Sequence, residues 1–202
     1  LCPGNNATFT VVASGTNPTY QWEKNTVDIP GETNSFLTLN SITNLNAGNY
    51  RCRITNGCGD TYSNEVALLV NNTSSISQNP SDQNLCVGDD ATFSVVASGS
   101  GLLFQWYKDG GIIGGETNPT LIINNVALTD IADYTCQING VCGNPLSAPG
   151  HLAVDVAPVI TTQPQTATVC SVLPHSLSVI PTGSNLSFQW VKDGLDIPGA
   201  TN

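Results

Sequence analysis

Residues 20–34 read YQWEKNTVDIPGETN, and two later stretches nearly copy them: residues 104–118 read FQWYKDGGIIGGETN, and residues 188–202 read FQWVKDGLDIPGATN. The tryptophans of the three stretches lie 84 residues apart, at Trp22, Trp106 and Trp190. The cysteines keep the same interval of 84, in the sets Cys2, Cys86 and Cys170; Cys52 and Cys136; Cys58 and Cys142. This period is too long for one unit of a helical solenoid and suits a small complete domain repeated in tandem.

The period divides the chain into three units. Residues 1–70 form repeat 1, which lacks a first strand; residues 71–157 form repeat 2, which is complete; residues 158–202 form repeat 3, which contains only the N-terminal part of a unit. Little sequence is left between the units, because the segments that connect them also contain the first strand of the next unit. The array is therefore predicted to be extended and semi-rigid.

Each unit has the pattern of short β-strands. The stretches ATFTVVASG at residues 7–15 and ATFSVVASG at residues 91–99 alternate apolar and polar residues and end at a glycine. Further short strands follow every 8 to 12 residues, with Gly, Asn and Pro between them, which is typical of a β-sandwich. No window has helical periodicity. The predicted fold class is all-β, in tandem antiparallel sandwiches.

The pattern resembles immunoglobulin-like (Ig-like) domains, in particular the tandem Ig-like repeats of large secreted and surface proteins of Bacteroidetes-type bacteria. The resemblance rests on the three tryptophans and on the stretches NAGNYRC, residues 46–52, and DIADYTC, residues 130–136. It implies that Trp22, Trp106 and Trp190 fill the core between two sheets. It also implies that Tyr50 and Tyr134 form tyrosine corners, in which the hydroxyl bonds the backbone a few residues upstream.

The cysteines depart from the familiar Ig pattern. There, the cysteine at the place of Cys52 or Cys136 bridges to a cysteine on strand B, but this chain has Val11, Val95 and Val179 at that place. The usual disulfide between the sheets is therefore absent. Cys52 and Cys136 are predicted to be small apolar core residues that pack near the tryptophans.

The other cysteines lie at the two ends of each unit in the Ig layout. Cys2 precedes strand B at one end, whereas Cys58 and Cys142 lie in the F–G turn at the other end, too far apart within one unit for a disulfide. Head-to-tail stacking would bring Cys2 of repeat 1 to Cys142 of repeat 2. One hypothesis is thus an interdomain disulfide between Cys2 and Cys142. The alternatives are bridges of Cys52 with Cys58 and of Cys136 with Cys142, or thiols that are free or bonded between chains.

The composition restricts the binding partners and the cellular location that can be expected. The formal net charge is −10, with only five Lys and Arg residues, so nucleic acid is not expected to bind. No apolar run approaches the about 20 residues of a membrane span, and no membrane insertion is expected. Seven cysteines and no methionine fit an oxidising environment, outside the cell or on a bacterial cell surface.

Catalytic and metal sites are not expected. The sequence has no nucleophile elbow, zinc-binding helix motif or phosphate-binding glycine loop, so we expect no enzyme activity and no cofactor. The pairs Asp89–Asp90 and Asp130–Asp133 leave calcium at the domain joints as a minor alternative. Repeat 1 carries Asn46 and Asn49 in place of the second pair, which favours a solvated acidic surface instead.

These features together predict a structural role. The chain is expected to be part of an Ig-like array that forms the stalk or filament of a large secreted or cell-surface bacterial protein, similar to an adhesin. Its expected partners are further Ig-like repeats of the same chain and, through self-association into filaments, other copies. The alternatives are an array of glycan- or protein-binding modules and an accessory region of a secreted hydrolase.

Overall fold

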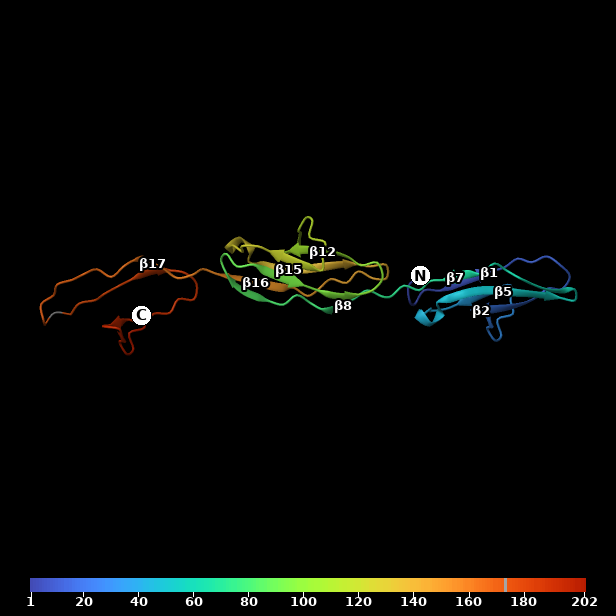
Figure 1. Ribbon diagram of the computed structural model, residues 1–202, viewed down its shortest axis with the longest axis horizontal. Coiled ribbons are helices and arrows are strands. Elements are labelled where there is room, and N and C mark those ends of the chain that lie inside the picture. The colour runs from blue at the N-terminus through green and yellow to red at the C-terminus, as the bar shows by residue number, and fades with distance from the viewer. Residues whose placement is uncertain (173) are drawn as a thin grey trace.

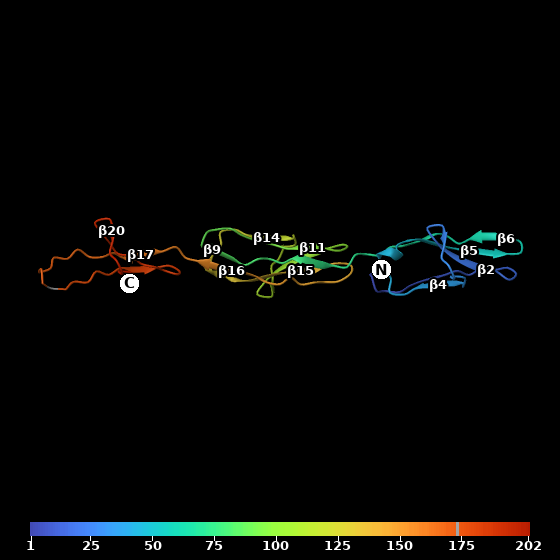
Figure 2. The same ribbon diagram turned by 90° about the horizontal axis from the view of Figure 1, so that it is seen from below.

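The computed structural model describes residues 1–172 and 174–202. Three units follow one another in a row along the long axis (Figure 1), and the row stays narrow when it is turned by 90° (Figure 2). The N-terminus lies beside the joint between repeats 1 and 2 (Figure 1). The array is thus extended, with repeats 1 and 3 at its opposite ends.

Repeat 1 is a small two-sheet unit. Its strands are β1 (Ala7–Thr10), β2 (Thr19–Lys24), β3 (Val27–Asp28), β4 (Phe36–Leu39), β5 (Gly48–Asn56), β6 (Gly59–Tyr62) and β7 (Val66–Leu68), with a 3-10 turn η1 (Asn44–Asn46). One sheet pairs β1 with β4, and the other has the order β3-β2-β5-β6, with β7 also paired to β5.

Repeat 2 has the same plan with additional strands. Its elements are β8 (Ser75–Gln78), β9 (Gln83–Cys86), β10 (Ala91–Ser94), β11 (Val96–Ser98), β12 (Leu103–Lys108), β13 (Gly111–Ile112), β14 (Thr120–Ile123), η2 (Leu128–Asp130), β15 (Ala132–Asn139) and β16 (Gly150–Asp155). The larger sheet has the order β13-β12-β15-β16-β9, in which β9 runs parallel to β16. Facing it, β10 pairs with β14 and β11 pairs with β8.

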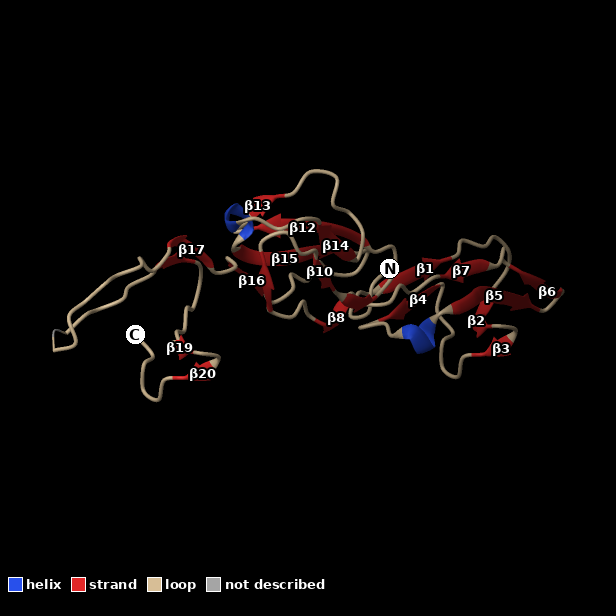
Figure 3. Cartoon of the chain, turned by 60° about the vertical axis from the view of Figure 1, so that its left-hand side comes forward, coloured by secondary structure: helices blue, strands red, loops and turns tan. Residues whose placement is uncertain are grey.

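Repeat 3 contains β17 (Val159–Thr162), β18 (Ile180–Thr182), β19 (Val191–Lys192) and β20 (Leu195–Asp196). The strand β17 pairs with β18, and β19 pairs with β20. The short hairpins β2–β3 and β12–β13 stand out from the sides of repeats 1 and 2 (Figure 3), and Figure 1 shows that they point to opposite sides of the row. Successive repeats are therefore turned relative to each other about the long axis.

Each complete core is built around one tryptophan and one cysteine. Trp22 lies opposite Cys52 in the β2–β5 register, and Trp106 lies opposite Cys136 in the β12–β15 register. All four side chains are buried, because alternate residues of these strands face the opposite sheet. The fold class predicted from the sequence is confirmed, and the two 3-10 turns are the helical elements of the described residues.

The sequence given starts inside repeat 1, since Leu1 is equivalent to Leu85 of repeat 2, so it holds no counterpart of β8 and no complete counterpart of β9. As a result Phe9 is only half-buried in repeat 1, whereas the equivalent Phe93 exposes 1% of its surface in repeat 2. The proposed boundaries at residues 70/71 and 157/158 fall between β7 and β8 and between β16 and β17.

Candidate functional site: the joint between repeats

The joint between repeats 1 and 2 contains a disulfide. It joins Cys2, which precedes β1, to Cys142, which lies in the turn after β15, and the two Cα atoms are 5.5 Å apart. The two cysteines are separated by 140 residues in the sequence, so the bond crosses from one unit to the next. The structure therefore brings together the pair expected from head-to-tail stacking.

The linker is held to repeat 2 by a pair of hydrogen bonds, which we call the joint clamp. The backbone N–H of Asn72 donates to Oγ of Ser100 at 2.9 Å, and the N–H of Ser100 donates to the carbonyl oxygen of Asn72 at 3.3 Å. Val156 and Ser184 make the same two bonds at the joint between repeats 2 and 3, both at 3.0 Å. The two joints are thus built by residues 84 positions apart.

Ser74 seats the linker on the cysteine turn of repeat 2. Its N–H donates to the carbonyl oxygen of Cys142 at 3.0 Å, and any side chain at Gly140 would overlap its hydroxyl. Gly140 is therefore needed for this close approach. Repeat 1 carries Asn56 at the equivalent position.

Repeat 1 contributes a polar contact from its 3-10 turn. Nδ2 of Asn44 donates to Oδ1 of Asn72 at 2.8 Å. Sequence reasoning missed Asn44, Asn72 and Ser100. The serines at 100 and 184 were a usable signal, because each follows a glycine and they keep the interval of 84.

The remaining described cysteines fall into two groups. Cys52 and Cys136 are fully buried, and desolvation by burial raises the pKa of both thiols. Cys58, Cys86 and Cys170 are exposed. The exposed thiols lie at the ends of units, whereas the buried thiols behave as core residues.

The alternative pairings are not found in the structure. Cys52 points into the core of repeat 1, whereas Cys58 lies at the tip of the β5–β6 hairpin, next to the paired residues Asn56 and Gly59. A Cys52–Cys58 bridge would require Cys52 to leave the core. Likewise Cys136 is buried, and Cys142 is bonded to Cys2 instead.

The aromatic residues take core positions in repeats 1 and 2. The hydroxyl of Tyr50 donates to the carbonyl oxygen of Asn46 at 2.7 Å, and that of Tyr134 donates to Asp130 at 2.9 Å. Each bond spans four residues, which is the geometry of a tyrosine corner. Burial raises the pKa of both tyrosines, so both stay protonated donors. Trp190 is only half-buried and lies beside a hollow that Ile160 and Pro181 also line.

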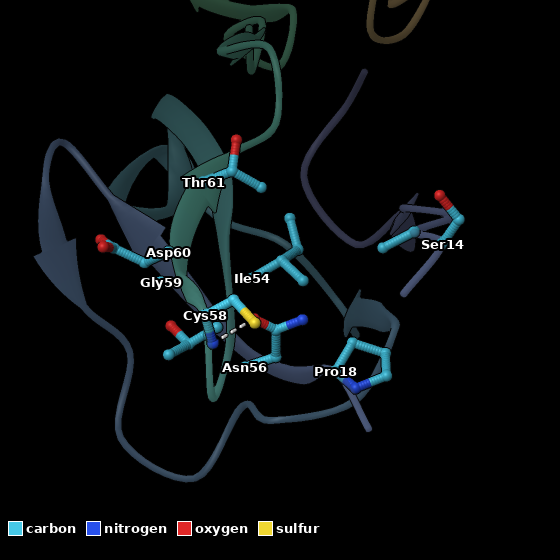
Figure 4. A pocket seen from close by; sticks show the side chains of 10 residues that line it. Ser14, Pro18, Ile54, Asn56, Cys58, Gly59, Asp60 and Thr61 are labelled. Carbon is cyan, nitrogen blue, oxygen red and sulfur yellow. Dashed lines mark hydrogen bonds between the residues drawn. The ribbon is translucent and has the colours of Figure 1, made fainter. Parts of the chain in front are cut away.

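The end of repeat 1 that lies away from repeat 2 carries a shallow pocket (Figure 4). It has a volume of about 250 Å³ and is lined by Cys58, Asn56, Pro18 and neighbouring residues. The N–H of Cys58 donates to Oδ1 of Asn56 at 2.9 Å, drawn as the dashed line in Figure 4. The lining offers one exposed thiol and one carboxylate, that of Asp60, and does not gather acid, base and nucleophile in one place.

The acidic residues considered for calcium already bond the backbone. Asp89 accepts from the N–H of Cys86 at 2.8 Å, Asp90 accepts from Asn125 at 2.7 Å, and Asp130 accepts from Ala127 at 3.1 Å. Asp133 lies 2.8 Å from Nδ1 of the exposed His151. Within residues 1–172 and 174–202, no group of three or more His, Cys, Asp and Glu residues is placed to hold a metal ion. Calcium at the joints stays a prediction.

Repeat 1 contains an ion cluster that the sequence did not indicate. Glu23 exposes only 2% of its surface and pairs with Arg51 at 2.8 Å and with Arg53 at 3.7 Å. Arg53 also pairs with Asp28 at 2.9 Å, and Arg51 lies over the ring of Tyr62. Because the buried carboxylate is neutralised by two guanidinium groups, the cluster serves structure.

In the part of the chain that the structure describes, no helix has the length and apolarity to cross a membrane.

Comparison with known proteins finds similarity to immunoglobulin domains. Residues 1–56 match the family model of the immunoglobulin domain. Leucine-rich repeats and immunoglobulin-like domains protein 2 of Mus musculus is 29% identical over 174 residues, which cover 80% of this chain and 16% of the mouse protein. Muscle M-line assembly protein unc-89 of Caenorhabditis elegans is 24% identical over 217 residues, which cover 98% of this chain and 3% of the nematode protein.

A solved structure supports the same fold. An I-band fragment of titin superposes with a TM-score of 0.78 at 22% identity, covering 97% of this chain and 76% of the fragment. The chain is thus a tandem array of Ig-like domains, similar to Ig-domain proteins of animals. It spans only a small part of the length of the two relatives, 16% and 3%.

Proposed function

We propose that this chain is a section of a stiff extracellular spacer, the stalk or filament of a larger protein, in which stacked Ig-like repeats hold another part of that protein at a distance. The observation that carries the proposal is the joint clamp, which is the same at both joints. Because the clamp recurs 84 residues later, the linker is fixed on the following repeat in the same way at both joints, as expected of a regular array.

The disulfide contact at the first joint supports stiffness. A bond between Cys2 and Cys142 limits bending at a second point, away from the linker, so that the two units can no longer hinge freely about residues 71–74. Such a bond persists in oxidising surroundings, which favours a location outside the cell. The resemblance to Bacteroidetes-type repeats favours a bacterial source, whereas the two relatives described above are animal proteins; the bacterial source stays a prediction.

Disulfide mapping tests the covalent part of this proposal. Protein secreted into an oxidising medium is alkylated without reduction, digested and sequenced by mass spectrometry. We expect a peptide of Cys2 linked to a peptide of Cys142. Pairing confined to Cys52 with Cys58 and to Cys136 with Cys142 would contradict the proposal.

Solution scattering tests the mechanical part. The double variant Cys2→Ser, Cys142→Ser should keep folded repeats but show a broader distribution of end-to-end lengths than the parent. Adding Ser100→Ala, which removes one hydrogen bond of the joint clamp, should broaden the distribution of end-to-end lengths further. Ser14→Ala is the matched control, because Ser14 is an exposed serine away from the joints. Equal length distributions for parent and double variant would show that the disulfide does not stiffen the array.

A further inference from the structure

The disulfide at the first joint connects two points that the backbone reaches only by a long detour. Cys2 and Cys142 are separated by 140 residues along the chain, yet their Cα atoms are 5.5 Å apart. The backbone between them builds repeat 1 from β1 onward and repeat 2 as far as β15. A covalent path through the disulfide therefore leaves residues 3–141 to one side, and we call these residues the bypassed segment.

Beyond Cys142 the covalent path crosses repeat 2 in one pass. Residues 143–149 run back along β15, where the N–H of Ile138 donates to the carbonyl oxygen of Pro145 at 2.9 Å. The strand β16 then pairs with β15 and with β9 as far as Asp155. Both β15 and β16 lie along the long axis of the row (Figure 1). The path from the disulfide to the next joint thus follows the axis of the array.

The strand β16 has little length to give under tension. A β-strand rises about 3.3 Å per residue, and a fully stretched chain reaches only about 3.3–3.6 Å per residue. Because β16 is already near this limit, it transmits tension with almost no lengthening. The clamp of Val156 with Ser184 follows directly after it and passes the tension to the next joint.

We propose that the disulfide carries tensile load past the bypassed segment, so that a pull along the array does not unravel repeat 1 or the strands β8–β15 of repeat 2. A load on the backbone from the N-terminal side reaches Cys2 before β1 and crosses to Cys142 through one covalent bond. Without that bond the same load passes through every residue of both repeats. A stalk that keeps its length under tension is a more specific form of the spacer role, on which this inference rests.

The bypassed segment also contains most of the sites for cleavage after a basic residue. Four of the five Lys and Arg residues lie within it: Lys24, Arg51, Arg53 and Lys108. Proteases cut where a chain is exposed or opens locally. A cut after any of the four leaves Cys2 bonded to Cys142, so the path that carries the load stays covalent. Trypsin-like cleavage in repeats 1 and 2 therefore does not break the stalk.

Single-molecule stretching of the full chain, with peptide handles fused to its two ends, tests the proposal. The contour length released is the readout, because a bond that only stabilised the repeats would raise the unfolding force without changing this length. In oxidising buffer the parent should release only residues 143–202, roughly 200 Å. The variant Cys2→Ser, Cys142→Ser should release roughly 480 Å more, since 140 further residues join the load path.

Reduction and a third cysteine provide the controls. After treatment with a phosphine reductant, the parent should release the same length as the double variant. Cys58→Ser is the matched control, because Cys58 is exposed and lies in the corresponding turn of repeat 1, and it should release as little as the parent. A parent that releases the length of the double variant, although mapping finds Cys2 linked to Cys142, would overturn the proposal.

Trypsin added under load gives a second test. The substitution Lys192→Gln removes the one basic residue outside the bypassed segment, so every further cut falls inside it. At a constant force that unfolds the double variant, Lys192→Gln tethers should survive trypsin. Tethers of the triple variant Cys2→Ser, Cys142→Ser, Lys192→Gln should rupture, because their opened backbone is the load path. Equal lifetimes of the two would contradict the proposal.

The load-bearing role and the spacer role fail separately. If scattering shows the broader length distribution for the double variant but the parent releases the full contour length under load, stiffness stands and the bypass of load is overturned. If the scattering distributions are equal but the parent still releases only the short length, the bypass of load stands and the stiff joint is overturned.

Discussion

The indole nitrogen of Trp22 donates a hydrogen bond to the carbonyl oxygen of Asn34, 3.0 Å away, and the bond recurs from Trp106 to Asn118 at 2.9 Å and from Trp190 to Asn202 at 3.0 Å. The N–H of each tryptophan is thus satisfied by the loop after the hairpin that follows it, and the rings of Trp22 and Trp106 also lie in a core. A buried indole needs such a partner. This explains why the stretches of 15 residues around the tryptophans are so alike.

Replacing the tryptophans should have unequal effects. Trp106→Ala leaves a large cavity in a complete core and should lower the free energy of unfolding of repeat 2 by about 3–5 kcal/mol. Trp190→Ala should lower the free energy of unfolding much less, because the ring of Trp190 is already half-exposed. Hydrogen exchange of the β15 amides reports on repeat 2 by itself. Equal protection of β15 in parent and Trp106→Ala would contradict this prediction.

The tyrosine corners should contribute measurably to stability. Tyr134→Phe removes the donor to the partly buried Asp130 carbonyl and should lower the free energy of unfolding by about 1–2 kcal/mol. Tyr50→Phe should act in the same way in repeat 1. Tyr107→Phe is the control, since no hydrogen bond of its hydroxyl is found within the described chain. An equal effect of all three variants would argue against the corner.

Thiol labelling should separate the cysteines into two classes. Cys58, Cys86 and Cys170 are exposed and should react rapidly with a disulfide reagent near pH 8. Cys52 and Cys136 should react only on unfolding, because they are buried and burial raises their pKa. Mass spectrometry of the chain labelled without denaturation shows which thiols have reacted. Fast labelling of Cys136 would show that the core of repeat 2 opens readily.

Asp130 should make repeat 2 sensitive to acid. The N–H of Ala127 first, and the ammonium of Lys108 in addition, lower the pKa of its carboxyl. Its folded pKa lies below its unfolded one, so its contribution is present above the unfolded pKa of about 4 and is lost as the pH falls further. Repeat 1 has Asn46 there, which accepts the N–H of Thr43 without titrating.

Asp130→Asn should therefore flatten the pH dependence of repeat 2 between about pH 5 and 2. Exchange of β15 amides measured across this range in parent and variant would reveal the change. The amides of β5 in repeat 1 provide the internal control. The prediction is wrong if the variant loses protection with falling pH as steeply as the parent.

Local patterns in the sequence sufficed for much of the fold. The alternation in residues 7–15 and 91–99 predicted strands, and β1, β10 and β11 lie within them. The spacing around Trp22 and Trp106 indicated core positions, which both residues occupy. The 3-10 turns η1 and η2 escaped notice, because one turn of three residues leaves no periodicity to read.

The joints could not be read in this way. The sequence by itself determined the repeat, the strands and the core of each unit, since these depend on residues that are near in the chain or alternate along a strand. In the structure Cys2 is bonded to Cys142, a pairing that the sequence left open beside the bridges of Cys52 with Cys58 and of Cys136 with Cys142. This pairing depends on how one folded unit is oriented against the next, and that orientation is set by contacts between residues far apart in sequence, such as the hydrogen bond from Asn44 of repeat 1 to Asn72.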